Sequence, residues 1–350
     1  MITSDNYSES HIRELQAVSK ADPILIERTL YAFGLLEALK RVGLDFIFKG
    51  GTSLMLMLPE PRRLSTDIDI VVEPDTDIDS YIQEASRIFP FREKEEQHRV
   101  GKNNIVKRHF KFTYDSPIKG QPFYILLDVL FEHNHYKHVV EKEIINGFLL
   151  TEGENLQVTI PTADCILGDK MTAFAPHTTG IPLNAGKDLE VIKQYFDVCS
   201  LIDVYDNFDD LRQTYFDVSG AELAYRGNPA TSNDALMDTI QAAICIGARG
   251  KYRKDEFPYY VNGTKEIVTH IFGRKYNMEA AYLDAPKVIY MAACILTGHP
   301  FDKDVETAAD RNEKLVDPNL MHLKSFRKIR TTGYEYLVLA DRLLRDLRDR

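Results

Sequence analysis

The sequence predicts an α+β protein in which a mixed α/β domain, residues 1–160, is followed by a mostly helical domain, residues 161–350. Before about residue 160, short runs rich in β-branched and aromatic residues are bounded by Gly, Pro and Asp, which is typical of strands. After that point apolar residues recur at helical spacing. The length of 350 residues is also typical of two domains.

Composition limits the class of protein. Hydrophobic residues make up 44% of the chain and charged residues 27%, as in ordinary globular proteins. The formal net charge of −10 argues against a uniformly basic nucleic-acid-binding protein, but it allows local basic surfaces. No apolar run approaches the roughly 20 residues that cross a bilayer, and the N-terminal MITSDNYSES lacks the features of a signal peptide. We therefore expect a cytoplasmic protein with no membrane association.

The cysteines and histidines do not form a recognisable metal site. The four cysteines are far apart, stand among apolar neighbours and form no Cys-x-x-Cys pair, which predicts buried, reduced thiols. The stretch EHNHYKH places His133, His135 and His138 close together. We interpret these histidines as polar residues at the end of a strand rather than as ligands of a transition metal.

The first predicted elements surround a pair of glycines. A helix begins at Asp22-Pro23, where Asp22 caps it and Pro23 takes its first position, and its apolar spacing continues to about Val42. A short strand, DFIFK at 45–49, ends at Gly-Gly, and the helix that follows ends at Pro59. The sequence therefore reads as strand, glycine turn and helix.

The remaining elements follow from periodicity. In the first domain they are a strand at 68–72, a helix at 77–88, strands near 96–101 and 104–114 with a turn between them, and a buried strand at 124–132. In the second domain they are helices at 161–175, 187–204, 208–217, 232–247, 255–273, 278–297 and 322–348.

The tripeptide Asp-Ile-Asp occurs twice, and the two copies differ in context. Asp67 and Asp69 stand at the start of the strand IDIVV, where alternation points both carboxylates to one face, roughly 7 Å apart at Cα. Such a pair is costly without a cation, and hard oxygen ligands suit Mg²⁺. Asp77 and Asp79 precede YIQEASRIF, so they are expected in the first turn of a helix, where acidic residues are favoured. The first copy is therefore the candidate metal-binding pair.

Two further sequence features accompany the first copy of Asp-Ile-Asp. The Gly50-Gly51 turn at a helix start would let backbone N–H groups approach a phosphate closely. Asp128 lies within the apolar strand YILLDVLFE, where a charge needs a partner. If this strand lies beside IDIVV, Asp128 completes a cluster of three carboxylates. The alternative is a structural Asp bonded to a neighbouring Lys.

These residues resemble those of a known family. The pattern GG-T-S-L, then R-x-S-x-D-I-D-I, then L-D-V is similar to the polymerase-β-like nucleotidyltransferases, and within them to the AbiEii/AbiGii toxin group. The matching residues are Gly50, Gly51, Thr52, Ser53 and Leu54, followed by Arg63, Ser65, Asp67 and Asp69. Many relatives have Gly-Ser where this chain has Gly50-Gly51, so either Thr52 or Ser53 is expected to supply the side-chain phosphate contact.

The resemblance continues downstream and covers about residues 45–205. IPTADCILGDKMTAFAP resembles the helix of the group that carries a lysine, here Lys170, and the loop PHTTGIPLNAG after it would lie near the nucleotide. KDLEVIKQYFDVCSLID resembles a later Lys–Asp helix in which Lys193 and Asp197 are at i, i+4. Lys187-Asp188 competes for this assignment, and a surface ion pair is the alternative explanation of Lys193 and Asp197.

The resemblance implies a metal-dependent nucleotidyltransferase that moves NMP from an NTP to an acceptor hydroxyl. Asp67, Asp69 and Asp128 would hold Mg²⁺ or Mn²⁺, and Asp128 would also act as the base. The glycine turn would hold the phosphates, and Lys170 or Lys193 would neutralise their charge. The acceptor would be RNA, such as a tRNA end, or a protein. The physiological role would be that of a toxin in a toxin–antitoxin or phage-defence system, encoded alongside a cognate antitoxin.

The distribution of basic residues bears on the acceptor. Residues 87–111 hold eight Lys and Arg against three Glu, and residues 321–350 hold eight against four acids, while ARGKYRK at 248–254 adds four more. If these segments converged, they would form an RNA groove. The alternatives are a small-molecule nucleotidyltransferase of the antibiotic-modifying type, for which basic segments would not matter, and a non-catalytic nucleotide-binding module.

Overall fold

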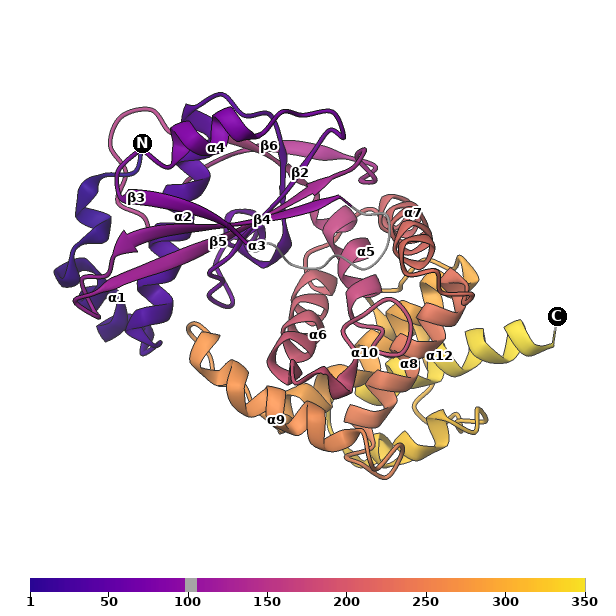
Figure 1. Ribbon diagram of the computed structural model, residues 1–350. Coiled ribbons are helices and arrows are strands. Elements are labelled where there is room, and N and C mark those ends of the chain that lie inside the picture. The colour runs from indigo at the N-terminus through magenta and orange to yellow at the C-terminus, as the bar shows by residue number, and fades with distance from the viewer. Residues whose placement is uncertain (98–105, 350) are drawn as a thin grey trace. The chain divides into compact units, whose positions relative to one another are not determined.

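A computed structural model describes residues 1–97 and 106–349 (Figure 1). The chain forms two compact units. The first, which we call the α/β unit, comprises Met1–Thr162 together with Thr269–Arg274. The second, the helical unit, comprises Ala163–Val268 and Lys275–Arg350. This arrangement confirms the predicted α+β class with a helical C-terminal half. The periodicity of the sequence did not reveal the short return of residues 269–274 to the α/β unit.

One mixed sheet forms the centre of the α/β unit. Its strands are β1 (Ile47–Lys49), β2 (Ile68–Val72), β3 (Phe91–Gln97), β4 (Lys107–Asp115), β5 (Pro122–Phe131), β6 (Val139–Glu143) and β7 (Gln157–Pro161). The order across the sheet is β3-β4-β5-β2-β1-β7-β6. The pairs β2–β5 and β1–β7 are parallel, and the other neighbouring strands are antiparallel.

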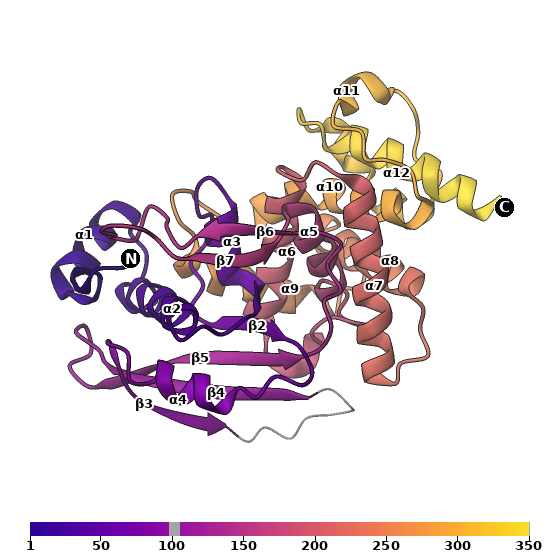
Figure 2. The same ribbon diagram turned by 90° about the horizontal axis from the view of Figure 1, so that it is seen from above.

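Four α-helices belong to the described part of the α/β unit. They are α1 (Glu9–Ser19), α2 (Pro23–Arg41), α3 (Gly50–Met57) and α4 (Asp79–Ala85). As predicted, Asp22 caps α2, because its side chain accepts hydrogen bonds from the first-turn N–H groups of Ile24 and Leu25. Helix α2 packs against β2, β5 and α4 (Figure 2). The strand residues in this core, among them Ile70 and Leu127, are almost fully buried.

A buried carboxylate fixes α2 against the sheet. Glu27 is fully buried and accepts hydrogen bonds from the Tyr114 hydroxyl at 2.8 Å, the Ser116 hydroxyl at 2.8 Å and the Ile118 N–H at 3.1 Å. These three donors satisfy a charge that would otherwise be costly to bury. The neighbouring residue Arg28, one position along the helix, is thereby held in place near the start of β2.

The helical unit is built around one long apolar helix. Its helices are α5 (Ala163–Ala173), α6 (Asp188–Ile202), α7 (Phe208–Arg226), α8 (Ser232–Gly247), α9 (Phe257–Ile267), α10 (Met278–Thr297), α11 (Val305–Ala308) and α12 (Gly333–Arg348). Helix α10 packs against α6, α8 and α12. It is long and apolar enough to cross a membrane by composition, contrary to the expectation from the sequence. However, 72% of its most apolar window is buried inside the structure, as in the core helix of a globular unit.

Several element boundaries differ from the prediction. The helix predicted at 322–348 is divided into a 3-10 helix, η4 (Leu320–Lys328), and α12, which begins at Gly333, where a side chain would meet Phe326. The helix predicted at 255–273 ends at Ile267 and a 3-10 turn. The helix predicted at 77–88 is the shorter α4.

The strands also differ from the prediction. The strand expected near 96–101 is β3, which begins at Phe91 and is described to Gln97. Parts of the two strands predicted near 96–101 and 104–114, and the turn between them, lie outside the described residues. Strand β6 was missed because all five of its residues are exposed, so it shows no apolar alternation.

The cysteines agree with the prediction. All four are free and buried. Burial raises the pKa of the Cys199, Cys245 and Cys294 thiols. These thiols are therefore apolar packing groups of the helical unit rather than reactive nucleophiles.

Candidate active site

A row of polar side chains runs across the sheet of the α/β unit. Lys49 on β1 is the register partner of Asp69 on β2, Asp69 is the partner of Asp128 on β5, and Asp128 is the partner of His109 on β4. Register partners point to the same face of a sheet, so these four residues, the polar row, share one face. On β1, β2 and β5, the residue that precedes the member of the polar row is apolar. It points to the opposite face of the sheet, which packs into the core.

The polar row lines a pocket of about 160 Å³. Lys107 and the apolar residues Ile70, Val129 and Leu130 complete its wall. The side chain of Asp128 is 37% exposed, so its carboxylate is accessible from this pocket. The prediction that the strand of Asp128 lies beside IDIVV is thus met, and the two strands are parallel.

Asp128 is paired with a histidine. The Nδ1 atom of His109 lies 2.7 Å from Oδ1 of Asp128. An ionised carboxylate only accepts hydrogen bonds, so Nδ1 of His109 must carry the hydrogen and donate it. The sequence had offered a neighbouring Lys as the alternative partner. It gave no reason to single out His109, because that contact depends on the register between two strands.

Asp67 has a different environment from Asp69 and Asp128. It precedes β2, its carboxylate lies 3.1 Å from a guanidinium nitrogen of Arg28, and its side chain is half exposed. In residues 1–97 and 106–349, no group of three or more His, Cys, Asp or Glu residues is arranged to hold a metal ion. The structure therefore brings two of the predicted carboxylates together and pairs the third with Arg28.

The Gly50-Gly51 pair allows two side chains to approach the backbone. Gly50 has φ +80°, and a Cβ atom there would also overlap the carboxylate of Asp69. A Cβ at Gly51 would overlap the guanidinium of Arg63 and lie 2.9 Å from the Ser65 hydroxyl. Gly50 is therefore required by its backbone conformation, whereas a side chain at Gly51 would require Arg63 and Ser65 to shift. The N-terminus of α3 is thereby placed beside Asp69 of the polar row.

The hydroxyls of Thr52 and Ser53 are both occupied by the backbone. Both residues are fully buried. The Thr52 hydroxyl donates to the carbonyl of Asp67 at 2.6 Å, and the Ser53 hydroxyl donates to the carbonyl of Gly50 at 2.9 Å. The N–H groups in the first turn of α3 have no acceptor inside the helix, so they are the donors that this turn offers to an anion.

A distant segment holds the loop of Arg63. The backbone of residues 269–274 bonds to this loop, with Leu64 N–H donating to the His270 carbonyl at 2.7 Å and Phe272 N–H donating to the Arg62 carbonyl at 3.2 Å. Arg63 itself is buried, and one of its guanidinium nitrogens donates to the Leu64 carbonyl. The loop is therefore braced by a segment about two hundred residues further along the chain, which no local pattern could indicate.

The lysine and aspartate motifs of the helical unit form a buried ion pair. Lys170 on α5 lies 3.0 Å from Asp197 on α6 and also donates to Gln194 at 2.9 Å. The side chain of Asp197 is only 1% exposed, so a surface ion pair is not its role. Lys193 is half-buried, while Lys187 is exposed immediately before α6.

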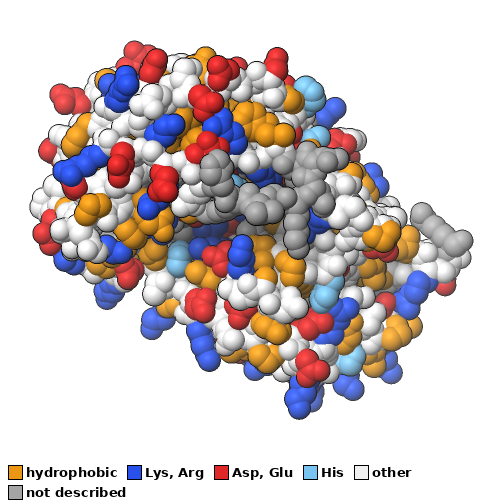
Figure 3. All heavy atoms as spheres, viewed as in Figure 1, with side chains coloured by type: hydrophobic (Ala, Val, Ile, Leu, Met, Phe, Trp, Pro, Cys, Tyr) orange, Lys and Arg blue, Asp and Glu red, His pale blue; other side chains and the backbone are white. Residues whose placement is uncertain are grey.

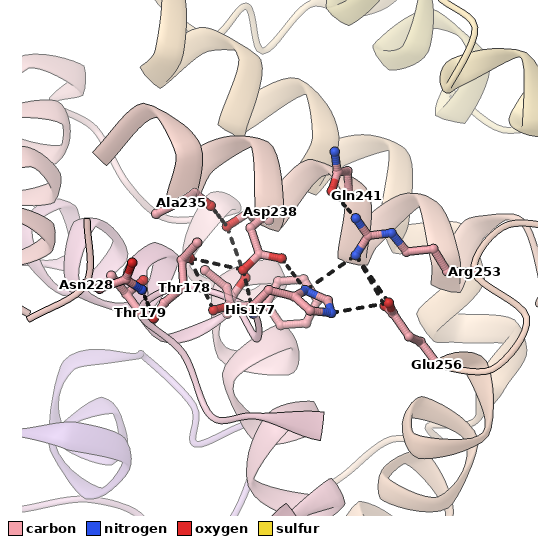
Figure 4. Close-up of polar contacts among 12 residues, drawn as sticks. His177, Thr178, Thr179, Asn228, Ala235, Asp238, Gln241, Arg253 and Glu256 are labelled. Carbon is pink, nitrogen blue, oxygen red and sulfur yellow. Dashed lines mark hydrogen bonds and ion pairs between the residues drawn. The ribbon is translucent and has the colours of Figure 1, made fainter. Parts of the chain in front are cut away.

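The loop after α5 is anchored inside the helical unit. Figure 4 shows His177 of this loop between Asp238 on α8 and Glu256 just before α9. Its Nδ1 lies 2.6 Å from Asp238 and its Nε2 lies 3.2 Å from Glu256. The Thr178 hydroxyl also donates to Asp238, and Arg253 bonds to Glu256. These contacts fix the first part of the loop PHTTGIPLNAG, which the sequence predicted to lie near a nucleotide.

The second Asp-Ile-Asp lies at the start of a helix, as predicted, but only Asp79 is in the first turn of α4. Asp77 precedes the helix, and the N-cap residue, Ile78, makes no side-chain cap. Asp77 accepts a weak hydrogen bond from the N–H of Asp79, the first residue of α4. The Asp79 carboxylate accepts a hydrogen bond from Arg108 at 2.7 Å, and this bond lowers the pKa of Asp79. Arg108 also pairs with Glu96. This copy therefore joins α4 to the sheet.

Comparison with known proteins gives a family match over most of the chain. The family described as "Nucleotidyl transferase AbiEii toxin, Type IV TA system" matches residues 35–257. A crystal structure of JHP933 from Helicobacter pylori has a TM-score of 0.46 and 12% identity, and covers 78% of this chain and 94% of its own. An H. pylori protein provisionally described as a nucleotidyltransferase has a TM-score of 0.47 and 13% identity, and covers 78% and 96%. No curated protein matches the chain.

Replacing one member of the buried pair should destabilise the helical unit. We expect Lys170→Met or Asp197→Leu to lower the free energy of unfolding by about 3–5 kcal/mol, because each leaves a lone charge in the interior. The double variant should recover most of this loss, since no charge remains buried. Urea unfolding followed by circular dichroism measures all three. Single variants that each cost less than about 1 kcal/mol would contradict a buried ion pair of this kind.

Proposed function

The chain belongs to the family of AbiEii nucleotidyl transferase toxins of type IV toxin–antitoxin systems, and we propose that it transfers NMP from an NTP to a hydroxyl group of RNA. Membership of the family makes the chain a nucleotidyltransferase with an NTP substrate and an antitoxin partner. The proposal adds the metal dependence, the acceptor and the role of each residue. We also propose that it acts in the cytoplasm and serves in phage defence.

The single observation that carries the proposal is the position of two carboxylates beside a helix N-terminus. Asp69 and Asp128 are register partners on adjacent strands, and the carboxylate of Asp69 lies against Gly50 at the start of α3. Adjacent carboxylates favour a cation, and the N–H groups of a helix N-terminus favour phosphate. A triphosphate bound with its divalent metal carries both kinds of charge.

The donor set fits a hard divalent ion. Carboxylate oxygens suit Mg²⁺ and Mn²⁺, whereas a zinc site would need Cys or neutral His ligands. Asp69 and Asp128 would hold the ion, with Asp67 as the third carboxylate. The bound ion would neutralise phosphate charge and favour ionisation of the attacking hydroxyl.

The protein's own groups then position the reactants. The first-turn N–H groups of α3 would bind the β and γ phosphates, with Gly50 and Gly51 allowing their close approach. Asp128 would accept the proton of the acceptor hydroxyl, as its carboxylate is exposed to the pocket. By the family resemblance, Lys170 or Lys193 would neutralise charge on the triphosphate, and Lys187 competes with Lys193 for this role. Most of the catalysis would come from positioning and electrostatics.

Two basic segments of the helical unit converge, which supports an RNA acceptor. The ring of Tyr252 lies 5.1 Å from that of His322, and a side chain on Gly247 would meet Leu323. Residues 248–254 and η4 are therefore neighbours. Across both units, basic and acidic side chains are interspersed on the face in Figure 3, so a local cluster matters more than the net charge.

Five exposed cations of these two neighbouring segments form what we call the basic cluster, and none of them has an acidic partner among the described residues. Within the described chain, no ion pair with an acid is formed by Lys251, Lys254, Lys324, Arg327 and Lys328, and all five are exposed. Other basic residues of the two segments are neutralised, since Arg249 pairs with Glu279 and Arg253 with Glu256. Unpaired surface cations next to Tyr252 suit a phosphate backbone with stacked bases. This cluster favours RNA over a small-molecule acceptor.

The two copies of Asp-Ile-Asp should differ in function. We expect Asp69→Ala to abolish nucleotide transfer without unfolding the protein. Asp79→Ala should retain transfer and cost at most about 1 kcal/mol of stability, because it removes only a surface bond to Arg108. Transfer of a radiolabelled nucleotide and thermal unfolding are measured for both. Equal loss of activity in the two variants would refute the assignment.

Transfer should depend on a hard divalent cation. We expect activity with Mg²⁺ or Mn²⁺, loss of activity after exhaustive chelation with EDTA, and no recovery with Zn²⁺, because the ligands are carboxylates. The measurement is the same transfer assay after dialysis and addition of each metal. Full activity in the chelated protein would exclude the proposed metal site.

RNA binding should weaken steeply with salt and depend on the basic cluster. Because Lys and Arg contacts to phosphate release counterions, raising salt from about 50 to about 200 mM should lower the affinity for RNA at least about tenfold. Filter binding measures this for the wild type and for the triple variant Lys251→Glu, Arg327→Glu, Lys328→Glu, which should bind RNA more weakly while NTP binding is unchanged.

A matched control changes three exposed lysines outside the basic cluster, by Lys142→Glu, Lys265→Glu and Lys275→Glu. It alters the net charge equally and should have a much smaller effect on RNA affinity. A flat salt response, or equal effects of the two triple variants, would favour a small-molecule acceptor.

A further inference from the structure

We propose that His109 is a positioning residue that orients the Asp128 carboxylate towards the divalent metal. This inference rests on the proposed function, because it assumes that Asp128 binds the ion. It assigns a role to a residue outside the motifs on which the sequence resemblance rests, and the polar row brings this residue to the site. His109 would not touch the substrate, and it would act only through Asp128.

The geometry of the pair defines which oxygen of Asp128 is available. Nδ1 of His109 donates to Oδ1 at 2.7 Å, and in the described chain Oδ2 accepts no hydrogen bond. A carboxylate with one oxygen held by an N–H donor has its rotation restricted and presents the other oxygen. Such second-layer donors commonly orient carboxylate ligands and raise metal affinity.

The position of His109 on the sheet makes the orientation rigid. Strand β4 is hydrogen-bonded to β3 on one side and to β5 on the other. The neighbouring residue Phe110 is fully buried, and the guanidinium of Arg108 lies over its ring at 4.9 Å. Arg108 in turn bonds to Glu96 and Asp79. The imidazole is itself only 15% exposed, so it is fixed by packing as well as by its partner.

A second histidine provides a comparison within the same unit. His133 has the same kind of contact, with Nδ1 at 2.8 Å from Oε2 of Glu73. However, the side chain of His133 is 80% exposed and that of Glu73 is 61% exposed, and neither residue lines the pocket of the polar row. His133 therefore has the chemistry of His109 without its position. A role in metal binding is expected for His109 alone.

The test is the affinity for Mn²⁺, measured by electron paramagnetic resonance of the full chain in the presence of a non-hydrolysable NTP. We expect His109→Leu to weaken Mn²⁺ binding about 10- to 100-fold, as for other lost outer-layer partners. His109→Asn should remain within about threefold of the wild type, because its amide nitrogen occupies the place of Nδ1. His109→Gln places its amide where Nε2 stood, so it should behave like His109→Leu. His133→Leu should bind as the wild type does.

The Asn and Gln variants keep the test independent of folding. Both are polar and similar in size, so a purely structural role of His109 would affect them alike, and thermal unfolding without metal checks this directly. The KM for the metal–NTP complex should rise in the Gln variant and stay near the wild-type value in the Asn variant. Equal Mn²⁺ affinities in the wild type, His109→Leu and His109→Gln would overturn this inference alone. A wild type that binds no Mn²⁺ would overturn the proposed metal site, and the inference with it.

Discussion

Two carboxylates held side by side on adjacent parallel strands are the constraint on which the α/β unit depends. Asp69 and Asp128 repel each other. Lys49, the register partner of Asp69, offers a positive charge, and His109, the register partner of Asp128, offers an N–H donor. The N-terminus of α3 adds its partial positive charge beside Gly50. The register that creates this row is set by the opposite face of the same strands, where apolar side chains pack under α2. The core therefore determines the geometry of the site.

Polar groups inside both units keep these elements in place. The fully buried Glu27 ties α2 to β4 and the turn after it, and the Lys170–Asp197 pair joins α5 to α6. Each charge has hydrogen-bonding partners, so its burial specifies one arrangement of the neighbouring elements. The basic cluster of the helical unit is different, because its four lysines and Arg327 are exposed and form no ion pair with an acid among the described residues.

The sequence predicted the parts of the site that are local. The Gly-Gly turn, the strand that carries Asp69 and the strand of Asp128 all follow from short patterns and apolar alternation. His109, the brace at 269–274 and the Lys170–Asp197 pair were missed because each depends on contacts between distant positions in the chain. The ion pair of Asp67 with Arg28 was missed for the same reason, and it makes the third carboxylate differ from the other two.

The most direct test of the metal–nucleotide site is X-ray diffraction from crystals grown with Mn²⁺ and a non-hydrolysable NTP. The anomalous signal of manganese locates the ion without assumptions about the ligands. We expect a peak bonded to oxygens of both Asp69 and Asp128, with the triphosphate at the first turn of α3. A manganese peak at Asp77 and Asp79, or a triphosphate bound away from Gly50 and Gly51, would contradict this account.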